Sequence, residues 1–298
     1  MSEHVPVLLK ETIESLALRP GDDVIDGTLG GGGHASAILE ATGPTGRLLG
    51  IEWDGRTLEE TRKSLERFGS RAMLVHANYR EMGRLARAYD FPSVSAILLD
   101  LGYSSFQIDD PERGFSFRFG GKLDMRYDEE SDRPTAADIL NSWPKADLAH
   151  ILREYGEEGA AGRLAAAIVE ARRHQPIETA DALAKLVVRT IGRGKGKIHP
   201  ATQTFQALRI AVNGEFDNLR AVLPEAVQLL RPATADRPGG RLAVIAFHSL
   251  EDRIVKDFFR DRPDLEVVTK KPLVAAEDEL DENRRARSAK LRVAARRT

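Results

Sequence analysis

The chain has 298 residues, no cysteine, a formal net charge of −2 and a hydrophobic content of 42%. The missing cysteines exclude disulfides, thiolate metal ligands and thiol nucleophiles, and the near-neutral charge argues against a protein that is basic as a whole. No apolar run reaches the roughly 18 residues of a membrane span, and the first four residues lack the pattern of a signal peptide. We therefore expect a globular, cytoplasmic protein with no membrane partner.

An amphipathic helix is expected first, over residues 5–18, where apolar side chains recur at helical spacing. Apolar runs and helical segments then alternate, with strands expected at 23–26, 47–52, 72–76 and 95–100 and helices near 55–68 and 80–89. Short, continuously apolar strands separated by helices are typical of a parallel sheet covered on both faces. The pattern therefore predicts an α/β fold with a doubly wound sheet.

Residues 101–213 interrupt this alternation, because they contain no convincing strand. They hold an aromatic, Gly-rich loop at 114–121 and helical stretches near 145–153, 157–173 and 179–190. Strand character returns at 241–247, and weaker candidates follow at 265–269 and 290–294. The simplest organisation is one sheet domain, formed by residues 1–103 and 214–298, with a helical insertion at 104–213.

A glycine-rich loop, Asp26-Gly27-Thr28-Leu29-Gly30-Gly31-Gly32-Gly33-His34, joins the first strand to the next helix. Glycine permits a sharp turn and leaves no side chain in the way, so a ligand can approach the bare amides at the helix N-terminus. The spacing Gly30-x-Gly32-x-x-Ala35 also fits the loose dinucleotide pattern. The loop therefore indicates a nucleoside cofactor without choosing between a dinucleotide and S-adenosylmethionine.

Polar residues stand at the ends of the predicted strands. Asp26, Glu52 and Asp100 close the first, second and fourth strands, and Tyr79 lies just past the third. In a doubly wound sheet these ends converge on the crevice where ligands bind. The Glu52 carboxylate would suit a ribose diol, although a solvated strand end would look the same and Asp54 could take that role. Three acidic ends and no basic residue in the loop favour a sulfonium cation over a pyrophosphate.

Seven motifs run in order along nearly the whole chain: DGTLGGGGH at 26–34, LLDLGYSS at 98–105, RGFSF at 113–117, LDMR at 123–126, HPATQTFQALRI at 199–210, FHSLEDR at 247–253 and RARSAKLR at 285–292. In these motifs the chain resembles the bacterial 16S ribosomal RNA cytosine-N4 methyltransferases. The resemblance implies a class I methyltransferase fold, which is Rossmann-like, and a helical insertion that recognises RNA.

The same resemblance implies methylation of the exocyclic N4 of a decoding-region cytosine in 16S rRNA, within the small ribosomal subunit, with S-adenosylmethionine as the methyl donor and no metal. A homodimer is compatible with this assignment. The cofactor contacts that it implies, carried over by matching position, are Gly32, Gly33, His34, Glu52, Tyr79, Asp100 and Gln107.

Three positions depart from the family pattern. The family usually has Arg where Gly31 stands, Asp where Glu52 stands, and Arg where Gln203 stands between two threonines. Glutamate keeps the carboxylate, so cofactor binding stays plausible after the first two changes. The third change puts in doubt an RNA contact at that position.

Asp100 is the residue that we expect to accept the proton of the substrate amine. The cytosine N4 lone pair is delocalised into the ring, so a positioned acceptor and in-line alignment should supply most of the acceleration. Tyr103 could stack on the base or belong to the core, and His34 could reach the methionine moiety or cap its helix. Two alternatives stay open: an NAD-dependent oxidoreductase that uses the same loop, and a non-catalytic ribosome-assembly factor.

Several segments could contact RNA once the target base is swung out of its helix. Phe115, Phe117 and Phe119 alternate with basic residues, which suits stacking and phosphate contact, although packing of this loop would use the same phenylalanines. The basic loop at 192–197 could meet a phosphate backbone, and the basic tail at 284–298 is either a solvated end or a polyanion-binding arm. Ser249 is expected to cap the helix after the fifth strand.

Overall fold

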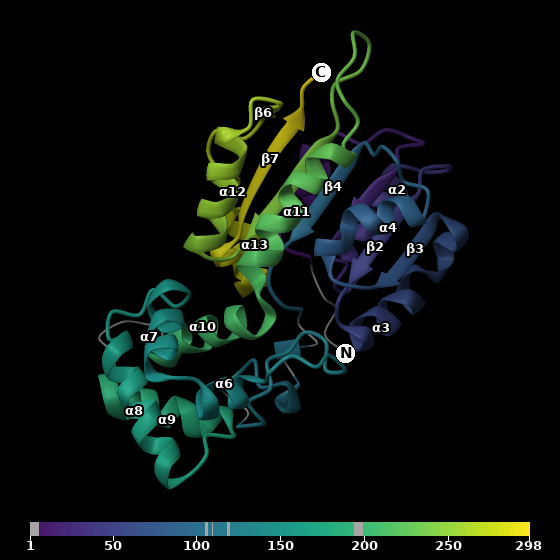
Figure 1. Cartoon of the computed structure of the whole chain (residues 1–298). Coiled ribbons are helices and arrows are strands. Elements are labelled where there is room, and N and C mark those ends of the chain that lie inside the picture. Colours follow the sequence, from purple (N-terminus) through teal and green to yellow (C-terminus); the bar gives the residue numbers. More distant parts are fainter. Residues whose placement is uncertain (1–5, 105–106, 109, 118–119, 194–198) are drawn as a thin grey trace. The chain divides into compact units, whose positions relative to one another are not determined.

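The computed structural model describes residues 6–104, 107–108, 110–117, 120–193 and 199–298 (Figure 1). The chain divides into two compact units, of which the first comprises Met1–Gly102 and Asp217–Thr298 and the second comprises Tyr103–Phe216. These bounds lie close to those of the sheet domain and the helical insertion that the sequence suggests.

A seven-stranded sheet in the order β3-β2-β1-β4-β5-β7-β6 forms the centre of the first unit. Its strands are β1 Val24–Asp26, β2 Leu48–Glu52, β3 Ala72–His76, β4 Ala96–Asp100, β5 Arg241–Ala246, β6 Leu265–Val267 and β7 Lys290–Arg296. Neighbours among the first five strands are parallel, whereas β7 runs antiparallel to both β5 and β6. All seven segments in which a strand was predicted form one, so the prediction of an α/β, doubly wound sheet is confirmed.

The helices of the first unit include those of the predicted alternation, with one correction at the start, and two that were not predicted, at 215–229 and 277–282. They are α1 Leu9–Leu16, α2 Gly33–Ala41, α3 Gly55–Leu65, α4 Met82–Ala88, α11 Glu215–Leu229, α12 Ser249–Asp261 and α13 Glu277–Glu282, with short 3-10 turns that include η2 Tyr79–Glu81 and η4 Arg284–Ser288. The first helix was predicted over 5–18 and is shorter, because the residues that flank it, Leu8 and Ala17, adopt left-handed conformations with φ of 54° and 50°. Among the described residues, every helix is too short or too polar to span a bilayer.

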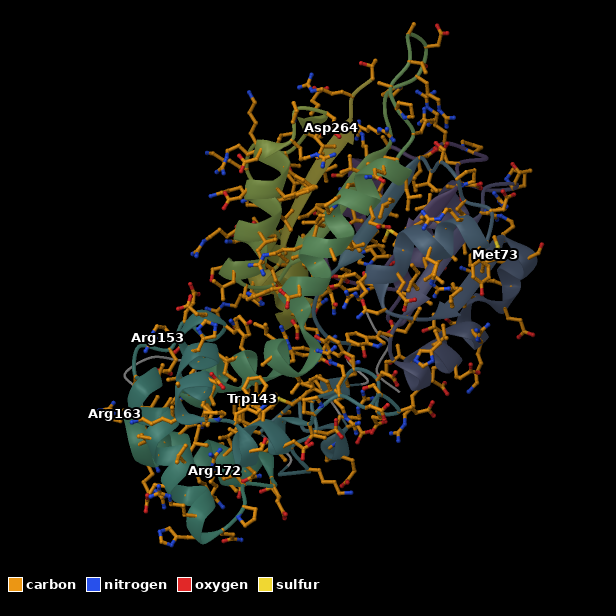
Figure 2. The ribbon with its side chains drawn as sticks, viewed as in Figure 1. Met73, Trp143, Arg153, Arg163, Arg172 and Asp264 are labelled. Atoms are coloured by element: carbon orange, nitrogen blue, oxygen red, sulfur yellow. The ribbon has the colours of Figure 1, made fainter. Side chains whose placement is uncertain are left out.

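The second unit is helical. It contains α6 Ala136–Ser142, α7 Lys145–Glu154, α8 Ala161–His174, α9 Ala180–Ile191 and α10 Ala201–Asn213, together with the 3-10 turn η3 Pro111–Arg113. The sequence predicted α7, α8 and α9 but missed α6 and α10. Arg172 of α8 donates hydrogen bonds to the carbonyl oxygens of Leu140 and Trp143, at 2.7 and 2.8 Å, and so ties α8 to the end of α6 (Figure 2).

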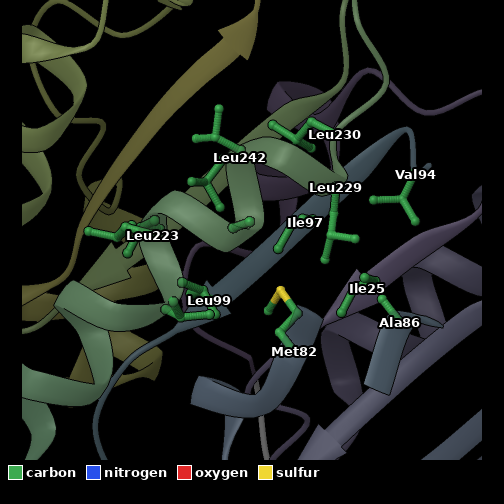
Figure 3. Close-up of a cluster of buried hydrophobic side chains, with 14 of the residues drawn as sticks. Ile25, Met82, Ala86, Val94, Ile97, Leu99, Leu223, Leu229, Leu230 and Leu242 are labelled. Carbon is green, nitrogen blue, oxygen red and sulfur yellow. The ribbon is translucent and has the colours of Figure 1, made fainter. Parts of the chain in front are cut away.

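Both faces of the sheet are buried. Ile25, Ile97 and Leu99 face a cluster that also contains Met82 of α4 and Leu223 of α11 (Figure 3). The alternate residues of the same strands face a second cluster on the other side, to which α1, α2 and α3 contribute and which includes Val24, Leu39, Leu48, Leu58 and Leu98. Because successive side chains of a strand point to opposite faces, strands buried on both sides must be apolar throughout.

Candidate functional site at the carboxyl ends of the strands

The loop between β1 and α2 joins three acidic strand ends. The Thr28 amide donates to Asp26 Oδ1 at 3.1 Å, and the Thr28 hydroxyl accepts a hydrogen bond from the Asp100 amide at 2.5 Å. The Gly30 amide donates to Glu52 Oε2 at 2.8 Å. Asp26, Glu52 and Asp100 therefore meet at one loop, as expected for the ends of β1, β2 and β4.

Two oxygens of these carboxyl groups are buried and have no hydrogen-bond partner among the described residues. Asp26 is 1% exposed, and among the described residues no hydrogen-bond partner is found for Asp26 Oδ2 or for Asp100 Oδ1, both of which are buried. A buried oxygen without a partner costs free energy, so such atoms are uncommon away from ligand sites. The two oxygens are suited to a cationic or hydrogen-bonding ligand.

The pKa values of the three acids follow from this burial. Burial raises the pKa of Asp26 to about 7, and the nearby Glu52 adds to the rise. Burial also raises the pKa of Glu52 to about 7, although the amides of Asp54 and Gly30 donate hydrogen bonds that oppose it. Burial and then the charge of Asp26 raise the pKa of Asp100 well above its ordinary range, while Arg285 acts in the opposite direction. A positively charged ligand would favour the ionised form of all three.

Two glycines of the loop are required by packing. A Cβ on Gly33 would lie 2.2 Å from Pro6 Cγ, and a Cβ on Gly32, where φ is 78°, would lie 2.7 Å from Thr61 Cγ2. No side chain caps α2, and the first-turn amides of a helix have no acceptor within it. The two glycines therefore allow the loop to pack closely against Pro6 and Thr61. The amides in the first turn of α2 suit the carboxylate or ribose of a nucleoside cofactor.

Glu52 and Asp54 have separate roles. Glu52 Oε1 accepts a hydrogen bond from the Asp54 amide at 2.8 Å, while the Asp54 side chain is the N-cap of α3 and accepts from the amides of Arg56 and Thr57. The Asp54 carboxylate is thus engaged in capping α3. Of the two acids, Glu52 is the better placed for a ligand at the glycine loop.

His34 does not cap its helix, because the N-cap of α2 is Gly32 and no side chain caps it. The His34 ring is buried. Its Nε2 lies 3.0 Å from the Val7 carbonyl oxygen, and its Nδ1 lies 3.7 Å from Asp100 Oδ2. The capping interpretation is therefore wrong, and a contact with a carboxylate replaces it.

Tyr79 begins the turn η2 three positions after the last residue of β3, His76. It is partly buried and packs against the hydrophobic cluster that contains Met82. Gln107 belongs to the second unit, where it is buried and its side-chain oxygen accepts a hydrogen bond from the Ser104 amide at 2.9 Å. The expectation that each of them contacts the cofactor stays a prediction.

The aromatic loop of the second unit is packed within that unit. Phe115 stacks on Tyr127 with ring centroids 5.7 Å apart, and Phe117 stacks on His199 at 4.4 Å. These contacts support packing as the role of the two phenylalanines. The predictions for Phe119 and for residues 194–197 of the basic loop lie outside the described residues.

Tyr103 also lies in the second unit and is 36% exposed, with the Arg209 guanidinium 4.8 Å from its ring centroid. Its ring is 5.9 Å from that of Phe115, centroid to centroid. The Tyr103 ring is therefore partly packed and partly open to solvent, so the expectation that it stacks on the substrate base stays a prediction.

Two expectations about the C-terminal part are corrected. His248, and not Ser249, is the N-cap of α12, and the Glu251 carboxylate accepts hydrogen bonds from the amides of Phe247 and His248 in return. The basic tail is not a simple solvated end, because β7 lies inside the sheet and the buried Arg292 pairs with Asp252 at 2.5 Å.

Comparison with known proteins places the chain in a family. Residues 1–297 match the model of the MraW methylase family. A protein of Thermomicrobium roseum named ribosomal RNA small subunit methyltransferase H is 48% identical, with 98% of this chain and 93% of the relative covered. A relative of the same name from Desulfotalea psychrophila is 46% identical, with 98% and 97% covered. The solved structure of TrmN from Thermus thermophilus is 14% identical with a TM-score of 0.46, over 97% of this chain and 48% of that one. The chain therefore belongs to the MraW methylase family, and the predictions of a class I methyltransferase fold and of S-adenosylmethionine as the cofactor are confirmed.

Proposed function

We propose that this protein methylates the exocyclic N4 of a decoding-region cytosine in 16S rRNA, within the small ribosomal subunit. The names of its relatives support rRNA of the small subunit as the substrate, and the motif resemblance supports cytosine N4 as the target atom. The structural observation that carries the proposal is the meeting of Asp26, Glu52 and Asp100 at one glycine loop, with two buried carboxyl oxygens that have no partner among the described residues.

Residues of the first unit would hold the cofactor. The amides of Gly33 and His34 would bind its polar end beside Gly32, whose own amide donates to the Leu29 carbonyl oxygen. Glu52 would bind its ribose, and Tyr79 would lie beside its adenine. S-adenosylmethionine, when bound, supplies an electrophilic methyl group next to a positive charge. The cluster of buried acids favours that charge, and Asp100 would lie nearest to it. Gln107 is the remaining cofactor contact that the motif resemblance implies.

Asp100 would accept the proton of the substrate amine. Transfer of the methyl group would leave the amine nitrogen with one proton too many, and a base must take that proton. A carboxylate whose pKa is raised by burial is a stronger base than an ordinary aspartate, so Asp100 in its ionised form suits this transfer.

The second unit would recognise the RNA. Arg153 of α7 and Arg163 of α8 are exposed, whereas Arg172 is committed to backbone carbonyls (Figure 2). Exposed arginines can contact phosphates without loss of a structural bond. Gln203 is also exposed on α10, where its side chain lies 3.4 Å from the Glu157 carbonyl oxygen, and it lacks the charge that the family usually carries there.

One experiment tests the proposal. The purified protein is incubated with methyl-labelled S-adenosylmethionine and either naked 16S rRNA or whole small subunits, and the labelled nucleoside is identified by mass spectrometry. We expect N4-methylcytidine at a single decoding-region position. Binding to particles without methyl transfer would favour an assembly factor, and NAD binding in place of S-adenosylmethionine binding would favour an oxidoreductase. The mass of the protein in solution will show whether it is a homodimer.

A further inference from the structure

The His34 ring links the N-terminal segment to the proposed proton acceptor. The Val7 carbonyl oxygen can only accept, so the ring nitrogen beside it, Nε2 at 3.0 Å, must be the donor. With Nε2 protonated, the other nitrogen, Nδ1, faces Asp100 Oδ2 at 3.7 Å. The backbone therefore fixes the orientation of the ring and directs one titratable nitrogen at one carboxylate.

The N-terminal segment that supplies this carbonyl is held at both sides of Val7. The Pro6 ring packs against Gly33, where even a methyl group would not fit, and the Leu8 amide donates to Glu279 Oε1 of α13 at 2.7 Å. Leu8 is fully buried. The acceptor of the His34 bond is thus positioned by contacts on either side and is not a mobile chain end.

The charges around Asp100 make a cation at His34 favourable. Asp26 at the end of β1 and Glu251 of α12 both disfavour ionisation of Asp100, and Arg285 of η4 is the positive group that opposes them. Asp26 in turn lies next to Glu52. A proton on His34 Nδ1 would add a second positive charge in contact with the Asp100 carboxylate.

We propose that His34 is a positioning residue that carries this proton and keeps Asp100 ionised, ready to accept the proton of the substrate amine. The proposal rests on the proposed role of Asp100, and it assigns the His34 side chain to the carboxylate, leaving only the His34 backbone amide for the cofactor.

Two substitutions separate the two ring contacts. The side-chain amide of His34→Gln can still donate to the Val7 carbonyl from the position of Nε2 but has no group at Nδ1. His34→Asn places a neutral donor near Nδ1 and gives up the bond to Val7. His174→Gln is a matched control, because His174 also pairs with a carboxylate, Glu170 at 3.4 Å, but on the surface, where solvent screens the pair.

The first readout is the pH profile of kcat. Without the charge on His34 the pKa of Asp100 rises, so we expect the acidic limb of His34→Gln and of His34→Asn to move to higher pH by about one unit, which lowers kcat about tenfold on that limb. At high pH the His34→Gln rate should approach that of the wild type, and the His174→Gln profile should not move. An unchanged limb in His34→Gln would overturn the proposal.

The second readout does not depend on activity. In protein labelled with 15N-histidine, the His34 signals are those that His34→Gln removes, and we expect both ring nitrogens to be protonated at pH 7. A neutral ring at pH 7 would overturn the proposal, and His34→Asn would assign the signals if His34→Gln failed to fold. Titration calorimetry should show S-adenosylmethionine binding within about threefold of the wild type for His34→Gln; lost binding with an unshifted pH profile would make the ring a cofactor contact instead. If the wild type transfers no methyl group, the proposed function fails, while the 15N measurement still decides the state of His34.

Discussion

The Gly30 amide donates a hydrogen bond to Glu52 Oε2 at 2.8 Å, so the end of β2 is fastened to the glycine loop. The carboxylate that the sequence suggested for a ribose therefore also holds the loop in place. If Glu52 binds the ribose as proposed, a change at this one side chain would alter both cofactor affinity and loop structure.

Glu52→Gln should weaken S-adenosylmethionine binding about tenfold or more, because hydrogen bonds to a charged group are worth roughly 1.5–3 kcal/mol. Titration calorimetry measures the effect. Glu52→Asp, which restores the residue usual in the family, keeps the charge but shortens the reach to the Gly30 amide, so a smaller loss is expected. Glu60→Gln, at an exposed ion pair with Lys63, serves as the control and should bind normally.

Asp100→Asn should lower the rate of methyl transfer by about 10²–10⁴-fold, because the amide cannot accept the proton of the amine. S-adenosylmethionine binding should change much less. The comparison needs single-turnover rates and binding constants of the same preparations, with Asp257→Asn on the exposed face of α12 as the control. Unchanged turnover in Asp100→Asn would show that another group accepts the proton.

Stability without cofactor should fall as the pH rises from about 4 to about 7. The pKa values of Asp26 and Glu52 are raised to about 7 in the folded protein from ordinary values of 3.8 and 4.5, so in this window the folded state binds protons that the unfolded state has lost. Melting temperatures between pH 5 and pH 8 test this slope, and Asp26→Asn should flatten it. S-adenosylmethionine should raise the melting temperature more at pH 8 than at pH 5, because a cation favours the ionised acids.

Gly33→Ala should destabilise the first unit by about 1–3 kcal/mol, since the new methyl group would overlap Pro6 and displace the N-terminal segment. Chemical denaturation measures the loss, and cofactor affinity should fall with it. Gly162→Ala is the opposite case. Gly162 lies in α8, where the added Cβ would meet no described atom within 4 Å apart from its chain neighbours and the backbone of its own helix, and a gain of up to about 1 kcal/mol is expected.

Replacement of Arg153 and Arg163 by Gln should weaken binding to small subunits and reduce its dependence on salt, because each lost phosphate contact lowers the number of counterions that binding releases. Filter binding at several salt concentrations gives the slope. Folding should be unaffected because both side chains are exposed. An equal affinity and slope would place the RNA contact elsewhere on the protein.

The strands could be predicted from the sequence because burial on both faces leaves them apolar throughout, and the meeting of Asp26, Glu52 and Asp100 follows from the way parallel strands end together. Helices that lack a strong local sequence signal could not be predicted in this way. Pro200 gives α10 no side-chain cap, and Pro224 lies inside α11, where proline argues against a helix.

The contacts of the His34 side chain could not be predicted from the sequence either. Its partners, Val7 and Asp100, lie far from it in the chain, and no periodicity connects the three residues. The only local hint is the glycine at position 33, which the sequence assigned to a ligand and which the structure shows is also needed for Pro6.

The strand β7 comes after β6 in the chain but lies between β5 and β6 in the sheet. During translation β6 therefore leaves the ribosome before the strand that it pairs with, whereas β1 to β5 can already assemble among themselves. The far edge of the sheet must form late, once β7 has entered beside β5. A chain cut between β6 and β7 would lose an inner member of the sheet, and such fragments should be cleared by proteases and not accumulate as partly working enzyme.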